Sequence, residues 1–250
     1  MSSCLVVDVG NTSTTLGLSR RGRIGSVQRL EGKAHTRASI DEALQRALGK
    51  HTVEGCALCS VVPASNVRWL RALKRATGTA PVLIHHKLNL GVKVRYPRPQ
   101  GIGADRLANA SAAIDQFGAP AIVADFGTAL TCDVISAAGE YIGGAIAPGL
   151  PVMTDYLAEK TALLPHIKLS GRPPAVGRST VGAMRIGANV GYRGMVREIV
   201  THLSEGLGAK KVSLCATGGY AKWALQGLDM PFVIEPNLTL SGVARIWSLN

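Results

Sequence analysis

Residues 5–12 read LVVDVGNT, and residues 122–129 read IVADFGTA. Both stretches are apolar runs that end in Asp-x-Gly, the pattern of a buried strand followed by a turn. One constant interval separates four matched pairs: Asp8 and Asp125, Gly10 and Gly127, Thr14 and Thr131, and Gly22 and Gly139. A single interval shared by four pairs indicates an internal repeat and predicts two halves of similar architecture.

Each copy of the repeat continues in the same way. Residues 14–18 and 23–30 follow the first Asp-x-Gly turn as two further strand patterns, and residues 131–135 and 140–147 follow the second. The tetrapeptide Arg20-Arg21-Gly22-Arg23 has the composition of a hairpin tip. Each half is therefore predicted to begin with a β-hairpin-led sheet.

Helical patterns alternate with these strands. Residues 40–48 are apolar at the period of a core-facing helix, and Ser39 followed by Glu42 is typical of a helix start. Further helices are predicted at 66–76, 105–117 and 179–207, and short buried strands at 56–62, 81–84, 212–216 and 232–234. The alternation predicts an α/β protein with an N-terminal half at 1–117 and a C-terminal half at 118–250.

Composition excludes several classes of protein. The 250 residues are 46% hydrophobic, which is enough to bury a core without disulfide or metal staples. No apolar run reaches the roughly 18 residues of a membrane span, and the first residues lack a secretory pattern, so we expect a cytoplasmic protein without a membrane partner. The five cysteines lack the spacing of a zinc site and are expected to be reduced, buried thiols.

The formal net charge of +12 favours anionic partners. Arg68, Arg71, Lys74 and Arg75 recur on one side of a predicted helix, which suits a solvated helix face or a nucleic-acid patch. No aromatic residues alternate with these charges, as they would in a single-strand binder. A nucleic-acid partner is therefore not expected.

The two Asp-x-Gly turns have the chemistry of phosphate binding. A glycine after a strand lets backbone N–H groups approach an anion, and the aspartates can hold cations that offset phosphate charge. Hydroxyl groups near the turns add donors, at Thr12, Ser13, Thr128 and Thr131. Neither the P-loop pattern nor the Rossmann glycine pattern occurs, so phosphate binding in a cleft between the two halves is predicted.

Seven segments form a further pattern: DVGNT at 8–12, YPRP at 96–99, GIGADRLAN at 101–109, DFGTA at 125–129, GGAIAPG at 143–149, TALLP at 161–165 and ATGG at 216–219. Together they resemble the type III pantothenate kinases of the actin/hexokinase-like ATPase superfamily. The resemblance implies duplicated ribonuclease-H-like (actin-like ATPase) domains with an active-site cleft between them. It also implies the transfer of phosphate from ATP to pantothenate, giving 4′-phosphopantothenate, the first step of coenzyme A biosynthesis.

The resemblance also implies residue roles. Asp105 would be the catalytic base. The ATP phosphate loop would be Asp8, Val9, Gly10, Asn11, Thr12, Ser13, Thr14 and Thr15, with Thr128 as a further ATP contact. The pantothenate pocket would be lined by Tyr96, Gly103, Ala104, Asp105, Arg106 and Thr180. Asp125 would bind the monovalent cation, K⁺ or NH₄⁺, and Mg²⁺ would accompany ATP. Family members are typically homodimers.

Two other functions remain open at this point. One is a kinase for another small alcohol, although Tyr96 and Arg106 favour an anionic substrate over a neutral sugar. The other is a regulatory accessory protein of the same fold with a nucleic-acid or protein partner. Leu130 and Ile186 depart from the family pattern, and Leu130 is expected to trim polar contacts near the cation or the phosphate.

Overall fold

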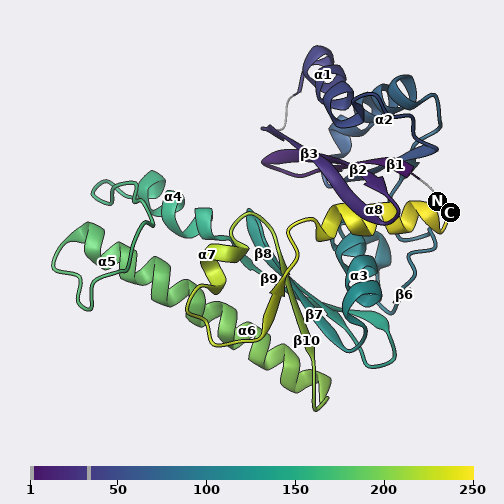
Figure 1. Cartoon of the computed structure of the whole chain (residues 1–250). Helices are drawn as coiled ribbons and strands as arrows, with labels where there is room; N and C mark the ends of the chain where they lie inside the picture. Colours follow the sequence, from purple (N-terminus) through teal and green to yellow (C-terminus); the bar gives the residue numbers. More distant parts are fainter. Residues whose placement is uncertain (1–2, 33–34) are drawn as a thin grey trace. The chain divides into compact units, whose positions relative to one another are not determined.

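The structure is a computed structural model that describes residues 3–32 and 35–250. The chain divides into two compact units, each assembled from separate segments (Figure 1). Unit 1 comprises Met1–Gly118, Gly139–Ile142 and Asn237–Asn250, and unit 2 comprises Ala119–Ala138 and Gly143–Pro236. No helix within the described residues is long and apolar enough to cross a membrane.

Unit 1 is built on a five-stranded sheet with the order β3-β2-β1-β4-β5. Its strands are β1 Ser3–Val9, β2 Ser13–Arg20, β3 Arg23–Glu31, β4 Gly55–Ser60 and β5 Val82–Leu83. Strand β1 is antiparallel to β2 and parallel to β4. The predicted hairpin tip is confirmed, because Arg21 and Gly22 connect β2 to β3 with φ angles of 51° and 74°.

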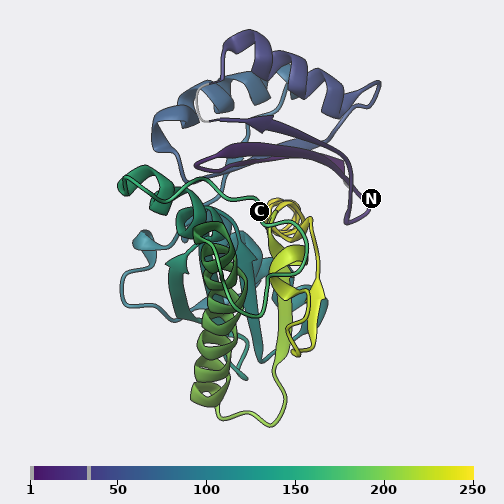
Figure 2. The ribbon, with the colours of Figure 1, turned by 90° about the vertical axis from the view of Figure 1, so that its left-hand side faces the viewer.

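Helices cover both faces of this sheet (Figures 1 and 2). On one face lie α1 (Arg37–Leu48) and α2 (Pro63–Thr77), whose apolar residues pack with the alternate β1 residues Leu5, Val7 and Val9. Helix α8 (Leu238–Ser248) packs on β1 as well, and α3 (Ala104–Phe117) packs on α8. The short 3₁₀ helix η1 (Pro99–Gly101) precedes α3.

Helix α1 begins earlier than its sequence pattern predicts. Ser39 is not its cap: the cap is Thr36, whose hydroxyl oxygen accepts a hydrogen bond from the Ser39 backbone N at 3.2 Å. Thr36 takes this position because its backbone is extended, as an N-cap requires, whereas Ser39 is already helical.

Unit 2 repeats the hairpin-led plan. Its strands are β7 Ala121–Phe126, β8 Ala129–Ile135, β9 Glu140–Pro148, β10 Ser213–Thr217 and β11 Phe232–Ile234, in a sheet ordered β11-β10-β7-β8-β9-β6. Strand β7 is antiparallel to β8 and parallel to β10, which repeats the pairing of β1 with β2 and β4. The edge strand β6 (Lys93–Val94) pairs only with Glu140 and Tyr141, the part of β9 that belongs to unit 1.

The helices of unit 2 are α4 Leu150–Lys160, α5 Thr180–Ile186, α6 Tyr192–Leu207 and α7 Ala221–Leu225. Helix α6 buries Tyr192, Val196 and Val200 in the same core as the β7 and β8 side chains. The continuous helix predicted at 179–207 is interrupted by the π-helical segment η2 (Gly187–Gly191). Both ends of η2 are glycines, whose low helix propensity reduces the cost of leaving the regular α-helical turn.

The C-terminal helix α8 joins unit 1, although the predicted C-terminal half includes it. The first break between the units, after Gly118, lies one residue from the predicted boundary. Close packing explains the placement of α8: a β-carbon on Gly242 would meet the backbone of Ala108 on α3, so only glycine lets the two helices approach this closely.

The five cysteines are buried thiols that form no disulfide, as the sequence predicts. Burial raises the pKa of the Cys4 and Cys215 thiols to about 12. These thiols are therefore protonated near neutral pH and are poor nucleophiles.

Candidate active site

The first Asp-x-Gly turn connects β1 to β2. It closes where the backbone N of Gly10 donates to the carbonyl oxygen of Ser13 at 3.0 Å, which leaves Asn11 and Thr12 exposed. Asp8 lies opposite Thr15 in the ladder, and Val9 lies opposite Thr14. Because side chains directly opposite each other share a face of the sheet, Asp8 and Thr15 face one side, while Val9 and Thr14 face the other.

The side of Val9 and Thr14 is the core beneath α1 and α2. Val9 packs in that core, and the fully buried Thr14 hydroxyl lies 3.2 Å from Nε2 of His35. Either of these two residues could therefore reach a phosphate only through its backbone. The side chains available to a phosphate from residues 8–15 are those of Asp8, Asn11, Thr12, Ser13 and Thr15, all exposed or half-buried.

The second turn, between β7 and β8, is one residue shorter. Gly127 N donates to the Ala129 carbonyl at 3.0 Å, and the ladder sets Asp125 opposite Thr131. Thr131 therefore occupies the place of Thr15, although the constant interval matches it with Thr14. The structural counterpart of Thr14 is Leu130, opposite Phe126.

Leu130 was expected to trim polar contacts near the cation or the phosphate, and this prediction is wrong because Leu130 lies on the other face of the sheet. Its side chain is fully buried in the core with Phe126 and Val196, on the face of the sheet opposite to Asp125. It packs as a core residue and does not trim polar contacts beside Asp125.

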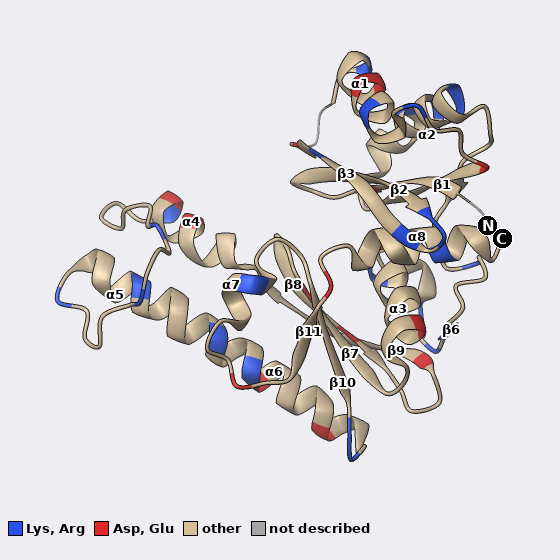
Figure 3. Cartoon of the chain, in the orientation of Figure 1, with Lys and Arg blue, Asp and Glu red and all other residues tan. Residues whose placement is uncertain are grey.

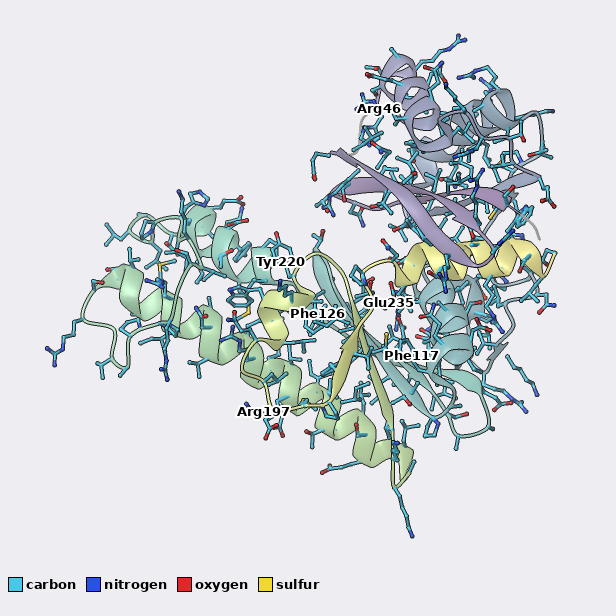
Figure 4. All side chains as sticks on the ribbon, in the orientation of Figure 1. Arg46, Phe117, Phe126, Arg197, Tyr220 and Glu235 are labelled. Atoms are coloured by element: carbon cyan, nitrogen blue, oxygen red, sulfur yellow. The ribbon has the colours of Figure 1, made fainter. Side chains whose placement is uncertain are left out.

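Asp125 lies against the Gly218-Gly219 turn that follows β10. Figure 4 labels the neighbours of these residues, Phe126 and Tyr220. A β-carbon on Gly218 would lie 2.6 Å from Oδ1 of Asp125 and 2.6 Å from the carbonyl oxygen of Phe126. Gly218 also has a φ of +91°, which L side chains rarely adopt. Next to it, the Tyr220 backbone N donates to the Phe126 carbonyl at 3.1 Å. Glycine thus keeps open a small cradle whose wall carries a carboxylate and a carbonyl oxygen.

That donor set fits a hard cation with oxygen ligands. Among the described residues no group of three or more His, Cys, Asp or Glu could hold a metal ion. Mg²⁺ usually retains several waters and binds through one or two carboxylates plus substrate phosphates, so the single carboxylates at these turns suit it as a partner of ATP.

Asp105 lies in the first turn of α3, where the helix dipole favours a negative charge. Its Oδ1 accepts a hydrogen bond from the Arg106 backbone N at 2.8 Å. A β-carbon on Gly103 would collide with that same oxygen and would lie 3.5 Å from Val61, just after β4. Gly103 is therefore what allows the carboxylate to fold back over the helix start.

Burial raises the pKa of the Asp105 carboxyl above its ordinary value, and the hydrogen bond from Arg106 and the Arg106 charge only partly oppose this. A partly desolvated carboxylate with a raised pKa is a stronger base than an ordinary surface aspartate. Asp105 thus has the properties of a proton acceptor.

Arg106 and Tyr96 meet around a third residue, Tyr141. The guanidinium carbon of Arg106 lies 5.9 Å from the centre of the Tyr141 ring, and the Tyr96 ring meets Tyr141 edge-on with centroids 6.3 Å apart. Ala104 is buried in the first turn of α3. Unit 1 therefore gathers the proposed base and four of the proposed pantothenate residues on the η1–α3 segment and the loop after β6.

Thr128 and Thr180 belong to unit 2. Thr128 is exposed directly after Gly127, and a β-carbon on Gly149 would meet its carbonyl group. Thr180 is the exposed first residue of α5, whose start is capped by the Ser179 hydroxyl accepting from Gly182 N at 3.1 Å. Both threonines are open to solvent, and Thr128 belongs to the same turn as Asp125.

Sequence reasoning missed Tyr141 and the contact of Gly218 with Asp125. The strand pattern at 140–147 could have indicated that residue 141 faces inward, but nothing in the sequence links it to Tyr96 or Arg106. The Gly218 contact depends on β10 pairing with β7, which brings together residues about 90 positions apart.

Comparisons with known proteins identify the family of the chain. A family model described as type III pantothenate kinase matches residues 4–202. The chain belongs to the type III pantothenate kinase family. It is 39% identical to a type III pantothenate kinase from Methylacidiphilum infernorum, over 97% of this chain and 87% of the relative. It is 38% identical to one from Dehalococcoides mccartyi, over 100% of this chain and 99% of the relative.

Solved structures confirm the predicted fold class. A ROK family glucokinase from Streptomyces griseus, in complex with glucose and AMPPNP, superposes with a TM-score of 0.54 at 15% identity, covering 97% of this chain and 98% of that one. An inorganic polyphosphate/ATP-glucomannokinase from an Arthrobacter strain superposes with a TM-score of 0.51 at 16% identity and covers all of both chains. The chain therefore has the ribonuclease-H-like fold of these kinases.

Helix α2 carries several Lys and Arg positions, coloured blue in Figure 3, and two of these side chains make contacts within unit 1. Arg75 pairs with Asp41 of α1 at 2.8 Å, and Arg68 donates to the backbone carbonyl of His35. These contacts use the arginines to join α2 to α1 and to the loop before it, which favours the solvated-face interpretation.

Proposed function

We propose that the chain transfers the γ-phosphoryl group of ATP to pantothenate, giving ADP and 4′-phosphopantothenate, the first step of coenzyme A biosynthesis. Membership in the family supports the reaction. The observation that carries it is Asp105, a half-buried carboxylate with a raised pKa, beside an arginine whose guanidinium lies over an aromatic ring. A proton acceptor next to an anion-binding group suits a substrate that is both an alcohol and a carboxylate.

In the proposed mechanism Asp105 is the catalytic residue. Its carboxylate takes the proton of the pantothenate primary hydroxyl as the hydroxyl oxygen forms a bond to the γ-phosphorus. The bond between the γ-phosphorus and the β–γ bridging oxygen breaks, and ADP leaves with that oxygen. The hydrogen bond from Arg106 N to Oδ1 fixes the direction of the carboxylate, so the catalytic contribution is both basicity and alignment.

Substrate binding is assigned to the residues around Asp105. The Arg106 guanidinium would pair with the pantothenate carboxylate, and Tyr96, 39% exposed, would cover the substrate. Gly103 and Ala104 supply backbone at the helix start. Thr180 would add a hydroxyl contact from the start of α5.

ATP binding is assigned to the exposed parts of the two Asp-x-Gly turns. Gly10, Asn11, Thr12 and Ser13 would offer backbone and side-chain donors to the phosphates, and Asp8 would face the Mg²⁺ that accompanies them. Thr128 would add a donor from unit 2. The Asp125 cradle would hold K⁺ or NH₄⁺ through its oxygen atoms.

We also propose a homodimer. Unit 2 exposes an unusual number of large apolar side chains between residues 150 and 190, including Leu163 at 89%, Val176 at 69%, Val190 at 62% and Tyr156 at 54% exposure. Exposed apolar residues concentrated in one stretch favour a protein interface. Because Thr180 lies in this stretch, a dimer would place it at the subunit interface. Mass measurement in solution tests the dimer.

An ADP-release assay tests the activity. Pantothenate in potassium buffer should release ADP at a rate that saturates with pantothenate, whereas glucose, mannose and simple hydroxy acids should give only background release. Faster ADP release with a sugar than with pantothenate would show that the chain is a kinase for another alcohol. No release with any alcohol, from protein that binds ATP, would contradict the kinase assignment.

A further inference from the structure

Tyr141 is a large side chain with no solvent exposure, near the start of β9. This start belongs to unit 1, while the rest of the strand belongs to unit 2. The ring of Tyr141 contacts Tyr96 and Arg106, which come from different segments of unit 1 and are both assigned to pantothenate. One buried ring therefore contacts two substrate residues that do not adjoin each other in the sequence.

The backbone holds this ring in register with the Tyr96 loop. Strand β6 pairs in parallel with β9, with Val94 opposite Tyr141, and Arg95 N donates to the Tyr141 carbonyl at 2.8 Å. Tyr96 is the next residue along. The ladder therefore fixes the distance between the Tyr96 backbone and the Tyr141 ring.

An ion-pair cluster reinforces the same register. Glu140, the neighbour of Tyr141, contacts Arg95 at 3.1 Å and Lys93 at 3.3 Å. The hydrogen bond from Arg95 holds the pKa of the Glu140 carboxyl below its ordinary value, with Lys93 adding to the effect. The pairs are exposed, so they align the two strands more than they stabilise the fold.

We propose that Tyr141 is a positioning residue for pantothenate: its ring face orients the Arg106 guanidinium, and its edge contact orients the Tyr96 ring. This inference rests on the proposed function. Arg106 is a long side chain with many rotamers, and a guanidinium over a buried aromatic face loses much of that freedom before the substrate arrives. A pre-oriented guanidinium binds a carboxylate more tightly because less entropy is lost on binding.

The test compares Tyr141→Leu with Tyr141→Phe. Leucine removes the π face, and phenylalanine keeps it. We expect Tyr141→Leu to raise the KM and the calorimetric Kd for pantothenate about tenfold, with ATP KM unchanged and kcat lowered less than threefold. Tyr141→Phe should restore pantothenate KM to within about twofold of the wild type.

Tyr192→Leu is the matched control. Tyr192 is equally buried and also contacts an aromatic ring, that of Trp223, over which Arg193 lies. It belongs to the core of unit 2 and has no assigned role. Both leucine variants should lower the melting temperature, but only Tyr141→Leu should raise pantothenate KM.

Some outcomes would overturn the proposal. An unchanged pantothenate KM in folded Tyr141→Leu would do so, as would equal rises in both KM values, or a failure of Tyr141→Phe to restore binding. If Tyr141→Leu does not fold, Tyr141→Met replaces it with the same expectations. Failure of the proposed function is separate, because the wild-type protein would then show no pantothenate-dependent ADP release.

A double-mutant cycle addresses the contact itself. Arg106→Lys keeps the charge but loses the planar group that stacks on the ring. The double variant with Tyr141→Leu should raise pantothenate KM by clearly less than the product of the single effects. Strictly multiplicative effects would mean that Tyr141 does not act through Arg106, and would overturn the proposal.

Discussion

The two Asp-x-Gly hairpins share a sequence pattern but differ by one residue in the turn. In unit 1 the turn closes from Gly10 to Ser13, and in unit 2 it closes from Gly127 to Ala129. Because side chains alternate along a strand, this single residue decides which side chain of the second strand faces the aspartate. Thr15 faces Asp8, and Thr131 faces Asp125.

The hairpins also differ in what surrounds them. In unit 1, helix α8 packs on the sheet that contains the hairpin, and α3, which carries Asp105, packs on α8. In unit 2, Gly218 lies against Asp125 at the end of the hairpin's first strand. The proposed roles therefore assign different local chemistry to each half: proton acceptance and substrate binding to unit 1, and cation binding to unit 2.

The largest effect is expected from Asp105→Asn. The amide cannot accept the substrate proton, so kcat should fall by roughly 10²–10⁴ while ATP binding by calorimetry stays within twofold. The control is Asp115→Asn on the same helix α3. Asp115 is 58% exposed and pairs with Arg245 at 3.0 Å, so its loss should leave kcat unchanged. Near-normal turnover of Asp105→Asn would show that Asp105 is not the catalytic base.

The pH profile should report the same group. Burial raises the pKa of Asp105, and the base works only when deprotonated, so activity should fall as the pH is lowered through the raised value. The acid limb of kcat/KM for pantothenate should lie above the pH range of an ordinary aspartate. The residual activity of Asp105→Asn should lack this limb. The effect on stability is opposite to that of a salt-bridged acid. Because burial raises the pKa of Asp105 in the folded protein, its ionisation lowers the free energy of unfolding as the pH rises from the pKa of the unfolded chain through that of the folded one.

Asp125→Asn separates the two hairpins. If the cradle holds the monovalent cation, the wild type should lose most activity when sodium replaces potassium, and Asp125→Asn should be about 100-fold less active in potassium and insensitive to the exchange. Asp8→Asn should also lower activity but should keep the potassium dependence. Equal potassium dependence in wild type and Asp125→Asn would contradict the assignment.

Gly218→Ala tests the cradle without changing a charge. The added methyl group would meet Asp125 and Phe126 at a φ of +91°, so we expect about tenfold lower activity and a destabilisation of about 2–3 kcal/mol. Gly219→Ala is the matched control, because no atom lies within 4 Å of its β-carbon position. Urea unfolding and the potassium activation constant distinguish the two variants.

The sequence predicted most strands and helices because their apolar patterns are strong, as at β7 and α3. Strand β11 was predicted as buried, but Val233 and Ile234 are exposed. It did not predict that α8 joins unit 1, since that depends on the contact of Gly242 with Ala108, residues more than 100 positions apart. Among the proposed site residues, Asp8 and Asp125 follow from the Asp-x-Gly motif, and Asp105 follows from the family resemblance. The face on which Thr14 lies could not be found, because a constant interval between repeats does not report the length of a turn.

The smallest effects are expected at two neighbouring residues of the unit 1 hairpin, Thr14 and Thr15. Thr15→Val should raise ATP KM about threefold, because it removes a hydroxyl from the face of Asp8. Thr14→Val should leave ATP KM unchanged but destabilise unit 1 by about 1–2 kcal/mol, because the buried His35 ring nitrogen loses its partner. Thr131→Val should behave like Thr15→Val if the shorter turn has shifted the register. Should Thr14→Val raise ATP KM instead, the alternation of faces in this hairpin would not govern phosphate contact, and the constant-interval matching of Thr14 with Thr131 would regain its functional meaning.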